Sequence, residues 1–288
     1  MDTIRRIGVV GAGLMGSGIA EICARAGLDV LVAETGPDTL AAGRRRVERS
    51  LARGVSSKKL SDADRERALA HVRFTTDLGE FTDRDLVVEA AAETERIKID
   101  VFATLDKVVQ REDAVLASNT SSIPITKLAM ATARPEQVLG IHFFNPVPVL
   151  PLVELVPSLL TAEDTQRRAE HFVTVVLGKQ VIRSTDRAGF VVNALLIPYL
   201  LSAVRMLESG FACAADIDQA MVLGCAHPMG PLALADLIGL DTTHAIAESM
   251  YAEFKEPLYA PPPLLLRMVE AGLLGTKTGR GFHDYATA

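Results

Sequence analysis

The sequence of 288 residues predicts an α/β protein: a doubly wound sheet with a helical hairpin insertion, followed by an all-helical C-terminal domain. Two observations support this fold class. Short apolar runs of strand character alternate with amphipathic helical patterns up to about residue 186. Beyond that point apolar residues recur only at helical spacing, in segments separated by Gly and Pro. We therefore expect two domains, residues 1–186 and 187–288.

The chain begins with a strand, a glycine-rich turn and a helix. The apolar run 7–10 leads directly into Gly11-Ala12-Gly13-Leu14-Met15-Gly16, and apolar residues at helical spacing follow. In this context the glycines permit a tight turn and a close approach of a pyrophosphate to a helix N-terminus, although they could also serve packing alone. Glu34 follows about 20 residues after the glycine-rich turn, at a position where an acid can bind the adenosine ribose. The predicted cofactor is therefore NAD in preference to NADP, with contacts from Gly11, Gly13, Leu14, Met15, Gly16 and Glu34.

The later elements follow from their patterns. A helix over 37–53 and a second one to about residue 72, opened by the capping box Ser61-x-x-Asp64, form a hairpin longer than a crossover requires. In the rest of the first domain we expect strands near 74 and at 86–90, 114–118, 138–142, 152–156 and 181–183, and helices near 97–108, 125–131 and 162–177. In the second domain we expect helices at 190–208, 216–223, 232–237, 242–254 and 264–271.

Two strands of the first domain carry residues suited to acid and base chemistry. His142 ends an apolar strand, where doubly wound sheets bind ligands, and Glu154 lies inside the apolar run 152–156. An unpaired buried carboxylate is disfavoured, so Glu154 is expected to pair with His142 and orient it as a general base. The alternatives are a structural histidine and a solvent-exposed edge-strand acid. Ser121 follows a third strand end and is a candidate ligand contact.

Other polar residues have two interpretations each. The hairpin carries a basic stripe, which is either a solvated face or a site for a phosphate-bearing substrate. Its members are Arg45, Arg49, Arg53, Lys58 and Lys59.

The helix that opens the second domain is apolar almost all round, which predicts burial on every side, within the domain or against a twin subunit. Its one amide, Asn193, is either a substrate ligand or part of an interhelical hydrogen bond.

Composition excludes several classes of protein. Thirty basic and thirty-six acidic residues give a formal net charge of -6, which argues against nucleic-acid binding. Three widely spaced cysteines suggest neither a disulfide framework nor a metal site. No apolar run reaches the length of a membrane span, and no targeting segment precedes the first strand. We expect a cytoplasmic protein with no metal, no nucleic-acid partner and no membrane association.

Together these residues resemble a family, the short-chain L-3-hydroxyacyl-CoA dehydrogenases, and especially its bacterial 3-hydroxybutyryl-CoA branch. The resemblance covers essentially the whole chain, through GVVGAGLMGSGIAE, LVVEAAAE, ASNTSSI, HFFNPVPV, PLVELV, GFVVNALLIPYL, HPMGPLALADLIGLDT and GTKTGRGFHDY in the family's order. It implies a Rossmann-type NAD domain, a helical domain that forms a homodimer interface, and reversible oxidation of (S)-3-hydroxyacyl-CoA.

The resemblance also implies roles for individual residues. His142 corresponds to the general base, Glu154 to its orienting carboxylate, and Ser121 and Asn193 to contacts with the substrate oxygen. Cofactor contacts correspond to Glu93, Lys98, Asn145 in the HFFNP loop and Lys277 in the C-terminal segment. The acyl-CoA nucleotide would meet the hairpin at Ser50 and at Lys58 or Lys59.

Three positions depart from the family pattern. Ala33 stands where many members have Asp, with the acid one residue later at Glu34, so the ribose contact and strict NAD preference stay open. Thr94 replaces a usual Asn, and Pro151 replaces a common Lys beside the active-site strand. A dehydrogenase of a non-CoA hydroxy acid and a catalytically idle dinucleotide-binding protein are the competing hypotheses. No residue identifies the acyl-chain length.

Overall fold

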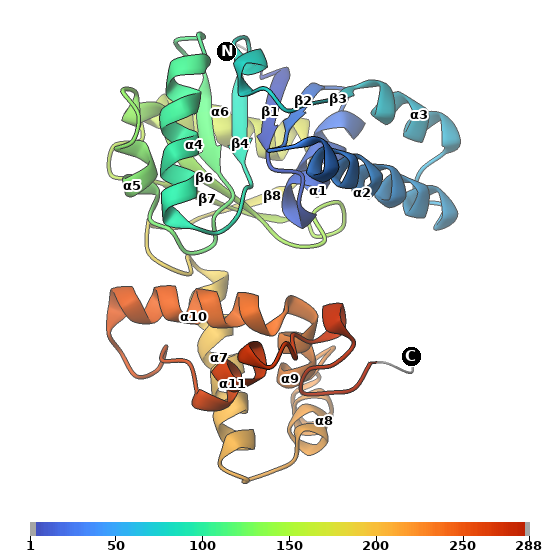
Figure 1. The fold of residues 1–288 in the computed structure, drawn as a ribbon, viewed down its shortest axis with the longest axis vertical. Helices are drawn as coiled ribbons and strands as arrows, with labels where there is room; N and C mark the ends of the chain where they lie inside the picture. The colour runs from blue at the N-terminus through green and yellow to red at the C-terminus, as the bar shows by residue number, and fades with distance from the viewer. Residues whose placement is uncertain (1–3, 286–288) are drawn as a thin grey trace. The chain divides into compact units, whose positions relative to one another are not determined.

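The computed structural model describes residues 4–285 and divides into two compact units, Met1–Arg187 and Ala188–Ala288. Each unit has its own cluster of buried apolar side chains. Figure 1 shows strands and helices in the first unit and helices in the second. Within residues 4–285, no helix combines the length and the apolar character needed to cross a membrane.

The first unit is built on one eight-stranded sheet of order β3-β2-β1-β4-β5-β6-β7-β8. Neighbouring strands pair in parallel except β6 and β7, which are antiparallel. The predicted doubly wound sheet is thus confirmed, and the strand order reverses beside β1, where such sheets bind ligands. The strands are β1 (Arg6–Val10), β2 (Asp29–Ala33), β3 (Val72–Thr75), β4 (Leu86–Glu89), β5 (Val115–Ser118), β6 (Val138–Phe143), β7 (Leu152–Pro157) and β8 (Gln180–Arg183).

The helices of this unit pack on the sheet or project from it. They are α1 (Leu14–Arg25), α2 (Pro37–Ser56), α3 (Asp62–Ala70), α4 (Glu95–Val108), α5 (Ile125–Ala129) and α6 (Glu163–His171), with short 3-10 turns at Leu78–Phe81 and Pro135–Gln137. The predicted hairpin is present as α2 and α3, which extend to one side of the sheet in Figure 1. The Ser61 capping box opens α3, which ends at Ala70 because the chain enters β3 two residues later. The predicted helix 162–177 changes to a π-helical turn at Phe172–Val176.

The second unit contains five helices and a 3-10 turn within its described residues. They are α7 (Val192–Glu208), α8 (Ala214–Cys225), α9 (Pro231–Ile238), α10 (Leu240–Phe254), α11 (Pro263–Glu270) and η4 (Thr276–Thr278). The first helix of this unit, α7, is covered on one face by its own unit, and burial of the other face against a twin subunit stays a prediction. Ile197 and Leu201 are fully buried, but Leu195 is 75% exposed, because the neighbouring helices cover only one face of α7.

Buried carboxylates fasten the C-terminal segment to α9. Asp236 accepts hydrogen bonds from the backbone N–H groups of Phe282 and His283 at 2.9 Å and from the Tyr285 hydroxyl at 3.1 Å. His283 Nε2 lies 2.7 Å from Asp218, which also accepts from the first N–H groups of α9. These bonds hold the segment that carries Lys277 in place.

Candidate active site

The glycine-rich loop lies between β1 and α1, as a dinucleotide-binding loop requires. Gly11 has φ +94°, and a Cβ on Gly16 would lie 1.8 Å from the Gly11 carbonyl oxygen. A Cβ on Gly13 would meet no protein atom within 4 Å, so open space faces this turn at the N-terminus of α1. The loop therefore fits a pyrophosphate that approaches the backbone closely.

Glu34 follows β2 directly and contacts this loop. Its Oε1 accepts a hydrogen bond from the Ala12 N–H at 2.5 Å, and Arg46 donates to the Ala12 carbonyl at 3.1 Å. Ala33, the last residue of β2, is buried. The acid thus stands beside the glycine turn one residue after the strand end, where an adenosine ribose would be within its reach. Of the other predicted loop contacts, Leu14 is exposed and Met15 is half-buried.

A buried ion pair lies where β4 ends and α4 begins. Lys98 Nζ lies 2.7 Å from Glu89 Oε1 and 3.2 Å from Glu93 Oε2, with Lys98 only 1% and Glu89 0% exposed. Ser118 Oγ donates to the second Glu89 oxygen at 2.6 Å, and the Ala91 N–H donates to Oε1 at 2.7 Å. Sequence reasoning missed Glu89, although an acid inside an apolar strand is the same signal that identified Glu154.

Glu93 connects this ion pair to the loop after β5. It accepts hydrogen bonds from the Thr120 hydroxyl at 2.5 Å and from the Ser121 N–H at 2.9 Å. Desolvation raises the pKa of Glu93, but the charge of Lys98 and these hydrogen bonds outweigh it, so its pKa is lowered from the usual range. Glu93 is therefore an ionised acceptor, and it brings the predicted cofactor residue Lys98 and the predicted substrate residue Ser121 into one network.

His142 and Glu154 are direct neighbours across β6 and β7. They are register partners in the antiparallel pair, and His142 Nδ1 lies 2.7 Å from Glu154 Oε2. Glu154 has no exposed surface, and His142 is buried against the edge of the Phe144 ring. When Nδ1–H donates to the carboxylate, the neutral imidazole carries its acceptor lone pair on Nε2. The pair can therefore act as a general base with a fixed tautomer.

The loop after β5 is tied to the strand that carries His142. Asn119 Oδ1 accepts from the Phe143 N–H at 2.9 Å, and the Asn119 N–H donates to the Glu89 carbonyl at 2.8 Å. These bonds link the Glu93 network to the His142 strand. Asn145, further along, is exposed and precedes a cis peptide bond to Pro146.

The predicted acyl-CoA residues lie on the hairpin, apart from these clusters. Lys58 and Lys59 are exposed in the turn between α2 and α3, while Ser50 is half-buried on α2. Beside Ser50, burial raises the pKa of Glu21, and the Ser50 hydroxyl and Arg25 partly offset that effect. The basic stripe continues through Arg45, Arg49 and Arg53, all exposed.

The two remaining candidates belong to the second unit. Asn193 is buried in the first turn of α7. Lys277 Nζ lies 2.5 and 2.6 Å from the two carboxylate oxygens of Asp241 on α10. The ammonium of Lys277 is thus held by an acid of its own unit.

Comparisons with known proteins agree with this arrangement. Residues 6–187 match the family "3-hydroxyacyl-CoA dehydrogenase, NAD binding domain", and residues 189–285 match "3-hydroxyacyl-CoA dehydrogenase, C-terminal domain". The chain is 62% identical to the 3-hydroxybutyryl-CoA dehydrogenase of Mycobacterium tuberculosis (strain ATCC 25618 / H37Rv) over 284 residues, or 99% of each protein. It is 40% identical to the mitochondrial hydroxyacyl-coenzyme A dehydrogenase of Homo sapiens, over 98% of this chain and 91% of that protein.

Solved structures give the same result. The crystal structure of M. tuberculosis FadB2 is 62% identical, with a TM-score of 0.97 over 99% of this chain and 100% of that chain. The (S)-3-hydroxybutyryl-CoA dehydrogenase PaaH1 from Ralstonia eutropha is 45% identical, with a TM-score of 0.91 over 98% and 99% of the two chains. On this evidence the chain belongs to the 3-hydroxyacyl-CoA dehydrogenase family, and residues 6–187 are its NAD-binding domain.

Proposed function

We propose that this member of the family catalyses the NAD-dependent, reversible oxidation of short-chain (S)-3-hydroxyacyl-CoA, with 3-hydroxybutyryl-CoA as its substrate. The observation that carries the proposal is the buried pair of His142 and Glu154, 2.7 Å apart, in an NAD-binding domain. The relatives named 3-hydroxybutyryl-CoA dehydrogenase support the choice of substrate. NAD, when bound, supplies the hydride acceptor.

In the proposed reaction the His142–Glu154 pair moves one proton. Nε2 of His142 takes the proton of the C3 hydroxyl as the hydride leaves C3, so the alcohol loses two electrons and becomes a ketone. Glu154 keeps Nδ1 protonated and stabilises the imidazolium that forms. In the reverse direction the imidazolium returns its proton to the carbonyl oxygen. Ser121 and Asn193 bind that oxygen and orient C3.

The cofactor is proposed to lie along the carboxyl edge of the sheet. Gly11, Gly13, Leu14, Met15 and Gly16 would surround its pyrophosphate, and Glu34 would bind its ribose. Glu93 and Lys98 would lie beside it as a neutralised pair, with Asn145 and Lys277 as further contacts. Ser50 and Lys58 or Lys59 would bind the nucleotide of acyl-CoA, because phosphates need cationic partners.

The second unit is proposed to form a homodimer, with residues 1–186 and 187–288 as the two functional domains. Its exposed apolar side chains, Leu195 on α7 among them, support a partner subunit. Within residues 4–285 the three cysteines form no disulfide, which supports a cytoplasmic location.

The deciding experiment follows the loss of NADH absorbance with acetoacetyl-CoA, and with acetoacetate and other free oxo acids as controls. We expect turnover of the CoA thioester and little turnover of the free acids. The reverse preference would assign the protein to non-CoA hydroxy acids. Binding of NADH without oxidation by any of these compounds would show a catalytically idle protein.

A further inference from the structure

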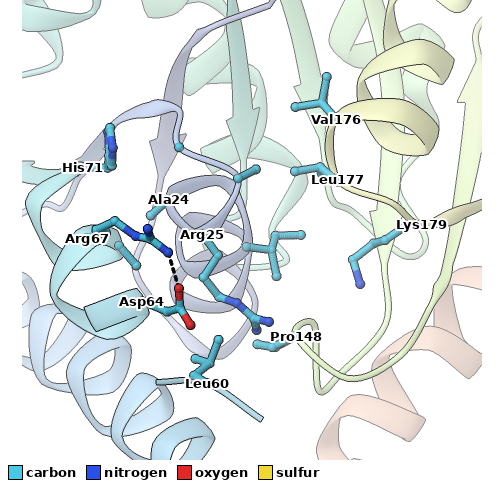
Figure 2. Close-up of a pocket in the computed structure, with 14 residues that line it drawn as sticks. Ala24, Arg25, Leu60, Asp64, Arg67, His71, Pro148, Val176, Leu177 and Lys179 are labelled. Carbon is cyan, nitrogen blue, oxygen red and sulfur yellow. Dashed lines mark hydrogen bonds and ion pairs between the residues drawn. The ribbon is translucent and has the colours of Figure 1, made fainter. Parts of the chain in front are cut away.

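A cavity of about 580 Å³ lies in the first unit, apart from the His142 and Glu93 clusters. Its walls come from the C-terminal half of α1, from α3 and from the segment that leads into β8. In Figure 2, Arg25 projects between the hairpin residues Leu60 and Asp64 on one side and Pro148 on the other, while Lys179 approaches from the segment before β8. None of the residues assigned above to NAD, to catalysis or to acyl-CoA lines this cavity.

The charges around the cavity are unequal. Of its lining residues, Arg25, Arg67 and Lys179 are cationic, and Asp64 is the one acid. Asp64 is already engaged, because it accepts hydrogen bonds from Ser61 and forms an ion pair with Arg67. The pair of Asp64 and Arg67, dashed in Figure 2, therefore leaves Arg25 and Lys179 without compensation from the cavity wall.

Lys179 is held by neutral groups alone. Its Nζ donates to the Val147 carbonyl at 2.8 Å and to the Leu150 carbonyl at 2.7 Å. Within residues 4–285 no carboxylate forms an ion pair with it. Burial lowers the pKa of Lys179, and the positive charge of Arg25 lowers it further, because the two cations repel each other.

Arg25 has only a weak acidic partner. Its guanidinium lies 3.5 Å from Glu21, and the second oxygen of that carboxylate is buried with no hydrogen-bond partner. Burial raises the pKa of Glu21 because it disfavours the charged carboxylate. Within residues 4–285, Arg25 and Lys179 thus face one cavity with a single acid, Glu21, paired to either of them, and the excess positive charge creates a potential that an anion would relieve.

We propose that this cavity binds a phosphate group of the nucleotide end of acyl-CoA, with Arg25 and Lys179 as its cationic ligands. This assignment rests on the proposed function and deepens it. The apolar side chains Leu60, Pro148 and Leu177 provide surface for the adenosine beside the phosphate. Hydrogen bonds from a guanidinium or ammonium to phosphate are among the stronger ones in proteins.

Two sets of contacts connect the cavity to residues of the proposed substrate site. Ser50, a predicted CoA contact, lies beside Glu21, and Glu21 lies one helical turn before Arg25. On the other side, the loop held by Lys179 follows β6, the strand of His142, and its Val147 packs against Gly18 of α1. The cavity thus joins the hairpin to the loop that leaves the active-site strand.

The test compares acetoacetyl-CoA with S-acetoacetyl-pantetheine, which lacks the nucleotide. For Arg25→Gln and for Lys179→Met we expect KM for the CoA thioester to rise on the order of 10- to 100-fold relative to KM for the pantetheine thioester. Arg25→Gln removes the ion pair with Glu21 but no contact with the 147–150 loop, whereas Lys179→Met removes contacts with that loop but leaves Glu21 paired, so an effect shared by both variants identifies the phosphate contact. Arg167→Gln, which removes an exposed cation paired with Asp164, is the matched control and should leave both KM values unchanged.

The outcomes separate the two proposals. If KM rises equally for both thioesters, or for neither, while NADH still binds to the variants, the cavity does not hold the nucleotide. Calorimetry with free CoA gives an independent measure, since its Kd should rise in the variants by the same factor. If the unmodified enzyme turns over neither thioester, the proposed function fails, and binding of CoA alone then decides the cavity's role.

Discussion

His142 on β6 and Glu154 on β7 are register partners, and their Nδ1 and Oε2 atoms are 2.7 Å apart. Among the strands described for residues 4–285, β6 and β7 form the single antiparallel pair of this sheet. Side chains alternate between the two faces of a sheet, so a slip of one residue would separate the imidazole from the carboxylate. The strand register is therefore what creates the general base of the proposed reaction.

Replacing His142 by Ala tests that base directly. We expect kcat for acetoacetyl-CoA reduction to fall about 100- to 10,000-fold, because general acid and base catalysis contributes this much. The affinity for NADH, followed by fluorescence titration, should stay unchanged. A rate near that of the unmodified enzyme would refute the assignment.

Replacing Glu154 by Gln removes the charge and keeps the size. The amide can still accept from Nδ1–H but stabilises the imidazolium less, so we expect kcat to fall about 100-fold. The matched control is Glu163→Gln, an exposed acid in the first turn of α6, for which kcat should not change. An unaltered kcat in Glu154→Gln would mean that this carboxylate serves packing alone.

The glycines of the loop should respond differently to one added methyl group. A Cβ at Gly16 would overlap the Gly11 carbonyl, whereas a Cβ at Gly13 would meet no protein atom. We therefore expect Gly16→Ala to lower the melting temperature. Gly13→Ala should keep that temperature and raise Kd for NADH about tenfold or more, because the methyl group projects toward the cofactor. Unchanged NADH affinity in Gly13→Ala would place the pyrophosphate elsewhere.

Lys98 neutralises the charge of the fully buried Glu89, so removal of Lys98 should lower the free energy of unfolding. Lys98→Met leaves Glu89 unpaired inside the fold, which should lower the free energy of unfolding by about 3–5 kcal/mol. Lys127→Met removes the cation of an exposed ion pair with Glu95 and should change the free energy of unfolding by less than about 1 kcal/mol. Urea denaturation measures the free energy of unfolding of both variants. Equal, small changes would show that the buried pair does not stabilise the unit.

The cysteines should differ in reactivity. Burial raises the pKa of Cys23 to about 12, whereas Cys213 and Cys225 are exposed. Because the thiolate is the reactive form, iodoacetamide should label the two exposed cysteines in the native protein and Cys23 only after unfolding. Mass spectrometry of the labelled peptides checks this. Native labelling of Cys23 would show that α1 opens readily.

Much of the fold was predictable because it depends on local pattern. The glycine turn between β1 and α1 and the capping box of α3 are encoded by neighbouring residues and were confirmed. The apolar run of α7 indicates that this helix has apolar faces, but it does not indicate how many of them the helices of its own unit cover. Leu195, an apolar residue of this helix, is exposed because no helix of its own unit covers it.

The sequence by itself determined the element order, the family and one acid that needed a partner, Glu154, because a carboxylate inside an apolar strand is costly wherever that strand lies. Only the tertiary structure brought the predicted pair of His142 and Glu154 together, and only it gave a partner to Glu89, which the sequence analysis had not singled out. Glu154 meets His142 through strand register, and Glu89 meets Lys98 where a strand and a helix converge. Arg25 and Lys179 face one cavity although they are far apart in the chain. These contacts depend on strand order and helix packing, which no local pattern specifies.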